Sequence, residues 1–455
     1  MTDIITTQKK IGHYRYRILA LVFMATTINY FDRSIIGVMA PTLEKLFNWT
    51  NKDYAYIMVS FKVAYTIGLM SMGWLIDRLG TKKGYTLSIA IWSIFGMLHA
   101  AIRPAFNFIG FVVARFGLGL GESGNFPSAV KTVGEWFPKR ERAFATGIFD
   151  SSTSVGAILA PFIVGAIVSV DGHNWQIPFL FTGFLSSIWI ILWWRTYHKP
   201  EMHPKLSVEE LKHIKSDSAE ETTDKIAWIK LLPKRETWAF TLTKLTDAVW
   251  WFYLFWGAKF LAVQFDVNIK NIALPFFLLY AMADGGSLIG GYTSDSLIRK
   301  GWTINRSRKL TMLICAILIL PVCYVPITES KWLAIFLIGL GAAGHQAWSV
   351  NGYTLASDVF PKKATASVIG FGGMFGALAG ILADLALGSV LDKANNSGYF
   401  WAFVIAGSSY IIIIGFVHWL MPHMTPLNDK LEYIEESGRQ KSEDRSWKTE
   451  VGSQN

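Results

Sequence analysis

Five charged residues lie inside long apolar stretches of the first half of the sequence: Asp32, Arg33, Lys62, Arg115 and Glu122. A charged side chain at the centre of a membrane costs about 2.5–3.5 kcal/mol on insertion scales, so such residues usually line a polar cavity and pair there. Arginine keeps its charge at any working pH, and a guanidinium binds a carboxylate through two parallel hydrogen bonds. The set therefore predicts a cavity for an anion, with Arg33, Lys62 and Arg115 as its ligands.

Asp32 and Glu122 can change protonation when their surroundings change from wet to closed. Coupling of transport to protons requires such groups, and we predict this role for both. Asp32 and Arg33 are neighbours on a helix and point about 100° apart. We therefore expect one to belong to an internal network while the other faces the cavity. The alternative is that the charges are structural ion pairs between helices, and it is strongest for Lys62.

The second half carries aromatic, amide and imidazole groups in its apolar stretches, which suit the apolar face and the hydroxyl groups of a sugar-like ligand. We predict substrate contacts for Trp250, His345, Gln346, Trp348 and Asn351. Packing is the alternative for Trp250, and a structural role is the alternative for His345. Asp284 and Asp384 are interpreted as helix-interface groups and not as ligands.

Membrane-spanning helices are the elements that must position these residues. Only 17% of the 455 residues are charged and 52% are hydrophobic, whereas soluble domains contain about 25% charged residues. A spanning helix needs about 20 mostly apolar residues. Twelve stretches are predicted to span: 17–40, 54–76, 84–102, 106–128, 143–168, 177–196, 237–263, 271–295, 310–328, 332–356, 365–390 and 399–421. The fold class is thus an all-α membrane protein.

Loop charge predicts the orientation of these spans. Lys and Arg gather in the connections after the even-numbered spans, as in Arg78, Lys82 and Lys83, while the other connections are short and nearly neutral. We predict a location in the plasma membrane, and the positive-inside rule then places both termini in the cytoplasm. The net charge of +10 is explained in this way without nucleic acid as a partner.

Two halves of the chain repeat each other. Phe137-Pro138-Lys139-Arg140 recurs 223 residues later as Phe360-Pro361-Lys362-Lys363, and three helix glycines share that offset. The repeat predicts two pseudo-symmetric six-helix halves with the substrate between them, the major facilitator layout. The expected parts are an N-terminal half (1–196), a cytoplasmic linker with one amphipathic helix (197–236), a C-terminal half (237–421) and a polar cytoplasmic tail with the composition of a disordered segment (422–455).

Gly73 opens the strongest short motif, which runs through Asp77 and Arg78 to Lys83. We predict that Gly73 lets helices approach closely, and that the charges of Asp77 and Arg78, at a cytoplasmic helix end, pair across the half and lock a closed gate. Gly119-x-Gly121-x-x-Gly124 fits a dinucleotide pattern, but no strand-turn-helix context surrounds it, so close helix packing is the better interpretation. The two cysteines share one apolar stretch and are expected to pack as small apolar residues.

Several segments resemble the anion:cation symporter family of the major facilitator superfamily, and bacterial hexuronate transporters within it. They are Asn29-Tyr30-Phe31-Asp32-Arg33, Ala64-Tyr65, Ala114-Arg115-Phe116, Gly119-x-Gly121-Glu122-Ser123-Gly124, Thr246-Asp247-x-x-Trp250-Trp251 and His345-Gln346-Ala347-Trp348. The resemblance covers nearly the whole chain between its tails. It implies that Tyr30 and Tyr65 contact substrate, and that Asp32, Arg33, Arg115 and Glu122 carry proton coupling and carboxylate binding.

The resulting expectation is proton-coupled symport of a hexuronate by alternating access, by a monomer with no metal and no cofactor. Another anion (galactonate, glucarate, a dicarboxylate or phosphate) or coupling to sodium stays open, because the sequence departs from its sugar-acid relatives at Thr153, Ser154 and Lys62. A sensor that does not transport is the alternative of a different class. An enzyme is not expected, since no nucleophile–base pair, metal-ligand spacing or phosphate loop occurs in a suitable context.

Overall fold

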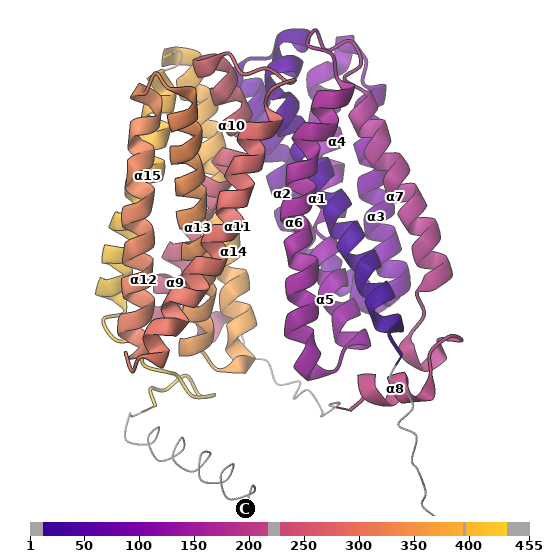
Figure 1. Cartoon of the computed structure of the whole chain (residues 1–455), viewed down its shortest axis with the longest axis vertical. Helices are drawn as coiled ribbons and strands as arrows, with labels where there is room; N and C mark the ends of the chain where they lie inside the picture. The colour runs from indigo at the N-terminus through magenta and orange to yellow at the C-terminus, as the bar shows by residue number, and fades with distance from the viewer. Residues whose placement is uncertain (1–11, 217–227, 395–396, 435–455) are drawn as a thin grey trace, which may run out of the picture.

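Long helices run along one axis of the molecule and form two bundles side by side (Figure 1). The computed structural model describes residues 12–216, 228–394 and 397–434. The first bundle contains α1 (Tyr14–Phe47), α2 (Asn51–Leu79), α3 (Thr81–Leu98), η1 (His99–Ala101), η2 (Pro104–Phe106), α4 (Asn107–Glu122), α5 (Asn125–Trp136), α6 (Lys139–Ile167) and α7 (Ile177–Thr196).

The linker holds η3 (Pro200–Met202), α8 (Val208–Ile214) and η4 (Trp228–Lys230). The second bundle contains α9 (Arg235–Leu245), α10 (Asp247–Phe265), α11 (Ala273–Arg299), α12 (Ile304–Ile319), η5 (Leu320–Ile327), α13 (Lys331–Val359), α14 (Lys362–Ala394) and α15 (Ser397–Leu420). In the described ranges the only β contact is the isolated bridge Leu427–Tyr433. The prediction of an all-α protein is therefore confirmed.

Nine helices of the described ranges are long and apolar enough to cross a membrane, or ten if the two segments of α2, bent by 47°, form one span. The predicted spans 17–40 and 237–263 lie on α1 and on α9 with α10, where polar and charged residues lower the hydropathy. The chain is thus a multi-pass membrane protein, and the number of twelve spans stays a prediction.

Two of the predicted spans are interrupted helices. The stretch 106–128 breaks at Ser123 and Gly124, between α4 and α5, and the stretch 237–263 breaks at Thr246, between α9 and α10. Charged residues flank both breaks: Glu122 ends α4 and Asp247 begins α10. Both breaks stay close to helical geometry, since Ser123, Gly124 and Thr246 keep right-handed helical dihedral angles and the Ser123 N–H donates to the Gly119 carbonyl oxygen at 3.2 Å.

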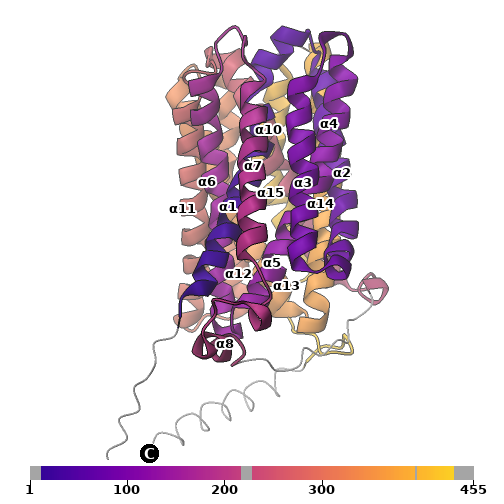
Figure 2. The same cartoon turned by 90° about the vertical axis from the view of Figure 1, so that its right-hand side faces the viewer.

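The bundles touch each other along three helix pairs, α2 with α14, α1 with α10, and α6 with α11. Figure 1 shows the bundles as two columns that lie closer at the end opposite α8 than at the α8 end, and in Figure 2 the first bundle lies in front of the second. Tight backbone contacts support this seam, since a Cβ on Gly37 of α1 would lie 2.6 Å from the carbonyl oxygen of Leu254 in α10.

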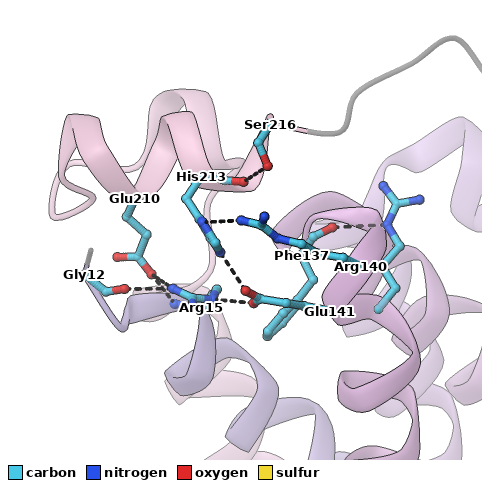
Figure 3. Close-up of polar contacts among 9 residues, drawn as sticks. Gly12, Arg15, Phe137, Arg140, Glu141, Glu210, His213 and Ser216 are labelled. Carbon is cyan, nitrogen blue, oxygen red and sulfur yellow. Dashed lines mark hydrogen bonds and ion pairs between the residues drawn. The ribbon is translucent and has the colours of Figure 1, made fainter. Parts of the chain in front are cut away.

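A cluster of charged residues joins helix α8 to the end of the first bundle (Figure 3). The Arg15 side chain donates to Glu141 of α6 at 3.0 Å and to Glu210 of α8 at 3.4 Å, and its backbone N–H donates to Glu210 at 3.1 Å. His213 of α8 lies 2.7 Å from Glu141 and 3.1 Å from Arg140. A short helix therefore lies in the predicted linker, whereas its amphipathic character stays a prediction, and residues 217–227 lie outside the described part.

The prediction of a disordered tail was wrong for residues 422–434. Met424, Leu427 and Leu431 are buried, and the backbone N–H of Leu427 donates to the carbonyl oxygen of Val359 at 2.8 Å. The Tyr433 hydroxyl donates to Glu236 at 2.8 Å. The tail contains so few of these apolar residues that its overall composition stays polar, which is why the prediction failed. Their spacing nevertheless lets them pack against the end of the second bundle. Residues 435–455 lie outside the described part.

Candidate functional site

A cavity of about 340 Å³ lies between the bundles. The first bundle contributes Tyr30, Arg33, Tyr65, Phe126, Asp150 and Ser154 to its wall. The second contributes Lys244, Asp247, Trp250, His345, Gln346 and Tyr353. Small-molecule sites have volumes of about 300–1,000 Å³ and combine apolar walls with a few polar groups, and this cavity fits that description.

Arg33 is the cation of the first wall. Its Nε donates to Oε2 of Glu122 at 2.8 Å, and one terminal nitrogen donates to Asn29 at 3.4 Å. The rings of Tyr30 and Tyr65 lie 4.6 and 4.8 Å from the guanidinium carbon, so the planar group is held between two aromatic faces. An arginine held in one orientation at a cavity wall suits an incoming carboxylate.

Arg115 lies deeper in the first bundle and does not line the cavity. It is fully buried, and its guanidinium carbon lies 4.4 Å from the ring centre of Phe61. None of its three guanidinium nitrogens has a hydrogen-bond partner among the described residues, and Oε1 of Glu122 also has none. A buried donor or acceptor without a partner costs about 1–3 kcal/mol, more if charged. A buried polar group without a protein partner is therefore a candidate for a functional role.

Asp32 turns away from the cavity, toward α3 and α7. It accepts a hydrogen bond from the Thr182 hydroxyl at 3.1 Å, and a Cβ on Gly96 would lie 2.9 Å from its Oδ2. Arg33 instead lines the cavity wall. The prediction that these neighbours face different surroundings is confirmed.

Lys62 crosses the seam between the bundles. Its Nζ lies 2.7 Å from Oδ2 of Asp384 in α14 and donates to the Gly380 carbonyl oxygen at 3.1 Å. Trp256 donates to the other carboxylate oxygen of Asp384 at 3.1 Å. Lys62, which we predicted to bind substrate, thus lies behind the cavity wall and joins α2 to α14. The interpretation of Asp384 as a helix-interface group agrees with this geometry.

Three of the predicted residues of the second half reach the cavity: Trp250, His345 and Gln346. The His345 ring stacks on Trp250 at 5.7 Å, and its Nδ1 lies 2.7 Å from the Tyr410 hydroxyl. Trp348 and Asn351 point elsewhere. Trp348 donates to the Thr243 carbonyl at 3.3 Å and Asn351 to the Gly290 carbonyl at 3.2 Å, and both contacts lie inside the second bundle.

The structure adds charged groups that we did not select as site residues. Lys244 and Asp247 form an ion pair of 2.7 Å on the second wall, and Lys244 also donates to the Tyr353 hydroxyl at 3.2 Å. Across the seam, Ser154 donates to Asp284 at 2.6 Å. The signal for Lys244 and Asp247 was available, because oppositely charged residues three apart in an apolar stretch share a helix face.

Polar links between the bundles close the cavity on the side away from α8. Along α1, α2 and α10 the linking residues lie beyond the cavity-lining ones, toward the end opposite α8. Lys259 bonds to Glu44 and Asn51, Tyr54 donates to the Phe255 carbonyl at 2.5 Å, and Asn51 donates to Asp392 at 2.8 Å.

A family model described as the Major Facilitator Superfamily matches residues 22–384. The chain belongs to the Major Facilitator Superfamily. It is therefore a transporter and not an enzyme, and the predicted family and fold are confirmed.

Curated relatives within the superfamily are sugar-acid transporters. The hexuronate transporter of Escherichia coli is 32% identical over 400 residues, which cover 86% of this chain and 91% of the relative. The galacturonate transporter of Dickeya chrysanthemi is 32% identical over 334 residues, 72% of this chain and 95% of the relative. The probable galactarate/D-glucarate transporter of Escherichia coli is 28% identical over 435 residues, 91% of this chain and 97% of the relative.

Solved structures share the fold. A bacterial homologue of the human lysosomal transporter Spinster, in an inward-facing and occupied conformation, superposes with a TM-score of 0.73 at 18% identity, covering 91% of this chain and 98% of the other. A D-xylose–proton symporter gives a TM-score of 0.73 at 14% identity, covering 90% of this chain and 99% of the other.

The predicted gating motif of this superfamily member lies at the α8 end of α2. Asp77 pairs with Lys131 of α5 at 2.7 Å, within the same half, and Arg78 lies 5.5 Å from the ring of Trp74. The expected close helix approach at Gly73 was wrong for this conformation, because a Cβ there would meet no atom within 4 Å. Close packing is confirmed at Gly121, where a Cβ would lie 2.5 Å from the backbone nitrogen of Trp92.

Proposed function

We propose that this chain is a proton-coupled symporter of a sugar-acid anion, most closely a hexuronate such as glucuronate or galacturonate. The observation that carries the proposal is the ion pair between Arg33, on the cavity wall, and Glu122, buried behind it. The sugar-acid substrates named for three relatives support the same substrate class.

The pair couples proton and substrate through competition for one guanidinium. While Glu122 is ionised it holds Arg33, as in this structure. Protonated Glu122 no longer holds a charge-assisted bond, so Arg33 is released to bind the carboxylate of a substrate bidentately. Loss of the proton restores the Arg33–Glu122 pair and expels the anion. Proton and anion therefore favour each other's binding, which is the thermodynamic condition for symport.

The opposite wall suits hydroxyl groups more than a second carboxylate. Gln346 and Trp250 offer an amide and an aromatic face. Lys244 on this wall is already neutralised by Asp247, and Asp150 of the first bundle adds a further carboxylate to the cavity. Like charge at short range disfavours an additional anion. This charge distribution favours a substrate with one carboxylate, such as a hexuronate, over a dicarboxylate.

The proposed location is the plasma membrane, with α8 and both termini in the cytoplasm. The support is the excess of Lys and Arg in the loops at the α8 end. In that orientation the links around Lys259 close the outer side, and the conformation is the one that faces the cytoplasm. Alternating access then requires those links to break as one half rocks against the other.

The test is uptake of radiolabelled glucuronate into proteoliposomes, with and without an inward proton gradient, in sodium-free buffer. Accumulation that depends on the gradient is expected. Glu122→Gln mimics the protonated acid, so it is expected to exchange glucuronate across the membrane while losing gradient-driven accumulation. Glu201→Gln removes a charge from an exposed pair with Lys215 and serves as the control.

Two results contradict the proposal separately. Absence of uptake under any gradient removes hexuronates as substrates, and a competition panel of galactonate, glucarate and phosphate then identifies the anion. Normal accumulation by Glu122→Gln removes the coupling role of Glu122 and leaves the substrate assignment standing.

A further inference from the structure

A second cavity lies on the outside of the molecule where the two halves meet. It has a volume of about 530 Å³ and shares no residue with the substrate cavity. One side is the end of α6, and the other sides are the first residues of α11 and α13 with the loop before α11. Helices α6 and α11 lie side by side in both views (Figures 1 and 2). We call this cavity the seam groove.

Most of the lining of the seam groove is apolar and accessible. Phe162, Leu274 and Trp332 line it and are 46%, 50% and 52% exposed. Because this surface belongs to a membrane protein, its solvent is lipid, and exposed apolar side chains there contact acyl chains. Tryptophan is enriched where the acyl region meets the headgroups, so Trp332 places the groove at that depth.

Two lysines give the lining of the groove a positive charge. Lys270 and Lys331 both line it, and no carboxylate does so among the described residues. Lys270 donates one hydrogen bond, to the Gly165 carbonyl at 2.9 Å, which leaves donors of its ammonium group for a ligand. Lys331 lies 5.3 Å from the ring of Trp332.

The start of α11 adds to this positive charge. The residue that caps it, Ile272, supplies no side-chain hydrogen bond, so the backbone N–H groups of Ala273 and Leu274 stay available at the positive end of the helix dipole, whereas Pro275 has no N–H. A phosphate is the group that matches two ammonium groups beside a helix N-terminus.

We propose that the seam groove binds an anionic phospholipid. Its phosphate lies between Lys270 and Lys331, and an acyl chain follows Phe162 and Leu274. Charge complementarity selects the phosphodiester, and the apolar lining selects a lipid over a free phosphate.

Such a lipid touches both halves at once. Gly165 and Phe162 belong to the first half, whereas Lys331 and Leu274 belong to the second. The halves are already in close contact here, since a Cβ on Gly165 would lie 2.7 Å from the Ile269 carbonyl oxygen. A bound lipid therefore stabilises the conformation in which this end is closed, by the mass action of any ligand that prefers one state.

Native mass spectrometry of the full-length transporter, titrated with palmitoyl-oleoyl phosphatidylglycerol, tests the proposal. A lysine contributes about 1 kcal/mol toward an anionic headgroup, so Lys270→Gln/Lys331→Gln is expected to weaken binding of the tightest lipid about 30-fold. Lys45→Gln/Lys393→Gln is the matched control. Both of its lysines are exposed at the same end of the bundle, outside the groove, and it removes the same charge. A thermal unfolding curve of each variant shows that it is folded.

Four outcomes overturn the proposal. Equal affinity of the groove variant and the wild type, or equal weakening in the control, means that the lysines hold no lipid specifically. Equal affinity for zwitterionic phosphatidylethanolamine removes the requirement for an anionic headgroup. Displacement of the lipid by glycerol 3-phosphate at matching concentration removes the acyl-chain contact and leaves a phosphate site only.

Discussion

Lys62 and Asp384 form an ion pair that links the two halves. Its geometry and burial allow the free-energy cost of losing one partner to be worked out. Their side chains are 2% and 3% exposed, and Nζ lies 2.7 Å from Oδ2. Removing one partner of a buried pair costs about 3–5 kcal/mol, because the other charge is left buried and unpaired. The cost applies to the conformation in which α2 and α14 touch, since opening of that seam brings water to the remaining charge.

Lys62→Met is therefore expected to shift the balance between the two conformations by roughly two to almost four powers of ten, at about 1.4 kcal/mol for each factor of ten. Glucuronate uptake into proteoliposomes should fall to background, and thermal stability in detergent should fall with it. Asp384→Leu should behave alike. The double variant Lys62→Met/Asp384→Leu removes both charges and should recover stability, because an apolar pair of similar volume often replaces a buried ion pair without loss.

Lys215→Met is the control. It breaks the ion pair with Glu201, in which the two side chains are 48% and 51% exposed, and exposed pairs contribute about 0–1 kcal/mol. Uptake and stability should change little. Wild-type uptake and stability in Lys62→Met would refute the reasoning, and so would a double variant as damaged as the sum of the single ones, because the two residues would then be energetically independent.

Three further predictions concern other contacts. Arg115→Ala should abolish glucuronate transport but retain glucuronate binding measured by calorimetry, because Arg115 lies outside the cavity wall; loss of binding would place it among the ligands. Gly121→Val should lower the unfolding temperature in detergent, by at least the 1–3 kcal/mol typical of overpacking, since its Cβ would overlap Trp92; unchanged stability would contradict that contact. Glu210→Gln should destabilise the protein by about 1.5–3 kcal/mol through its bonds to Arg15, and an unchanged unfolding temperature would show that α8 is loosely attached.

The architecture was predictable because a membrane constrains sequence strongly. Backbone groups must be satisfied within each helix, so apolar stretches translate directly into helices. The charged residues inside those stretches were equally visible, and the angle between successive helix positions correctly separated Asp32 from Arg33. Both inferences use only local geometry, which the order of residues contains.

The partners of the charges were not predictable, because they depend on which helices become neighbours. Lys62 was assigned to substrate, but its partner Asp384 lies on a helix of the other half. Trp348 and Asn351 have the residue types of a sugar site, yet helix rotation turns them toward Thr243 and Gly290. A residue type shows what a side chain can bind, whereas the rotation of its helix decides whether that ligand is within reach.

The two buried arginines of the first half, Arg33 and Arg115, are both related to Glu122 but differ in their contacts. Glu122 is bonded to Arg33 through one carboxylate oxygen, while its other oxygen and the whole Arg115 guanidinium have no partner among the described residues. In the proposed cycle Glu122 is protonated and neutral when Arg33 turns to a substrate carboxylate, so the loss of this bond leaves no unpaired buried charge. Arg115 is the second buried cation near Glu122, and an opposite charge favours the ionised form of a carboxyl group. In this proposal Arg33 binds the substrate, whereas Arg115 favours loss of the proton after the substrate has left.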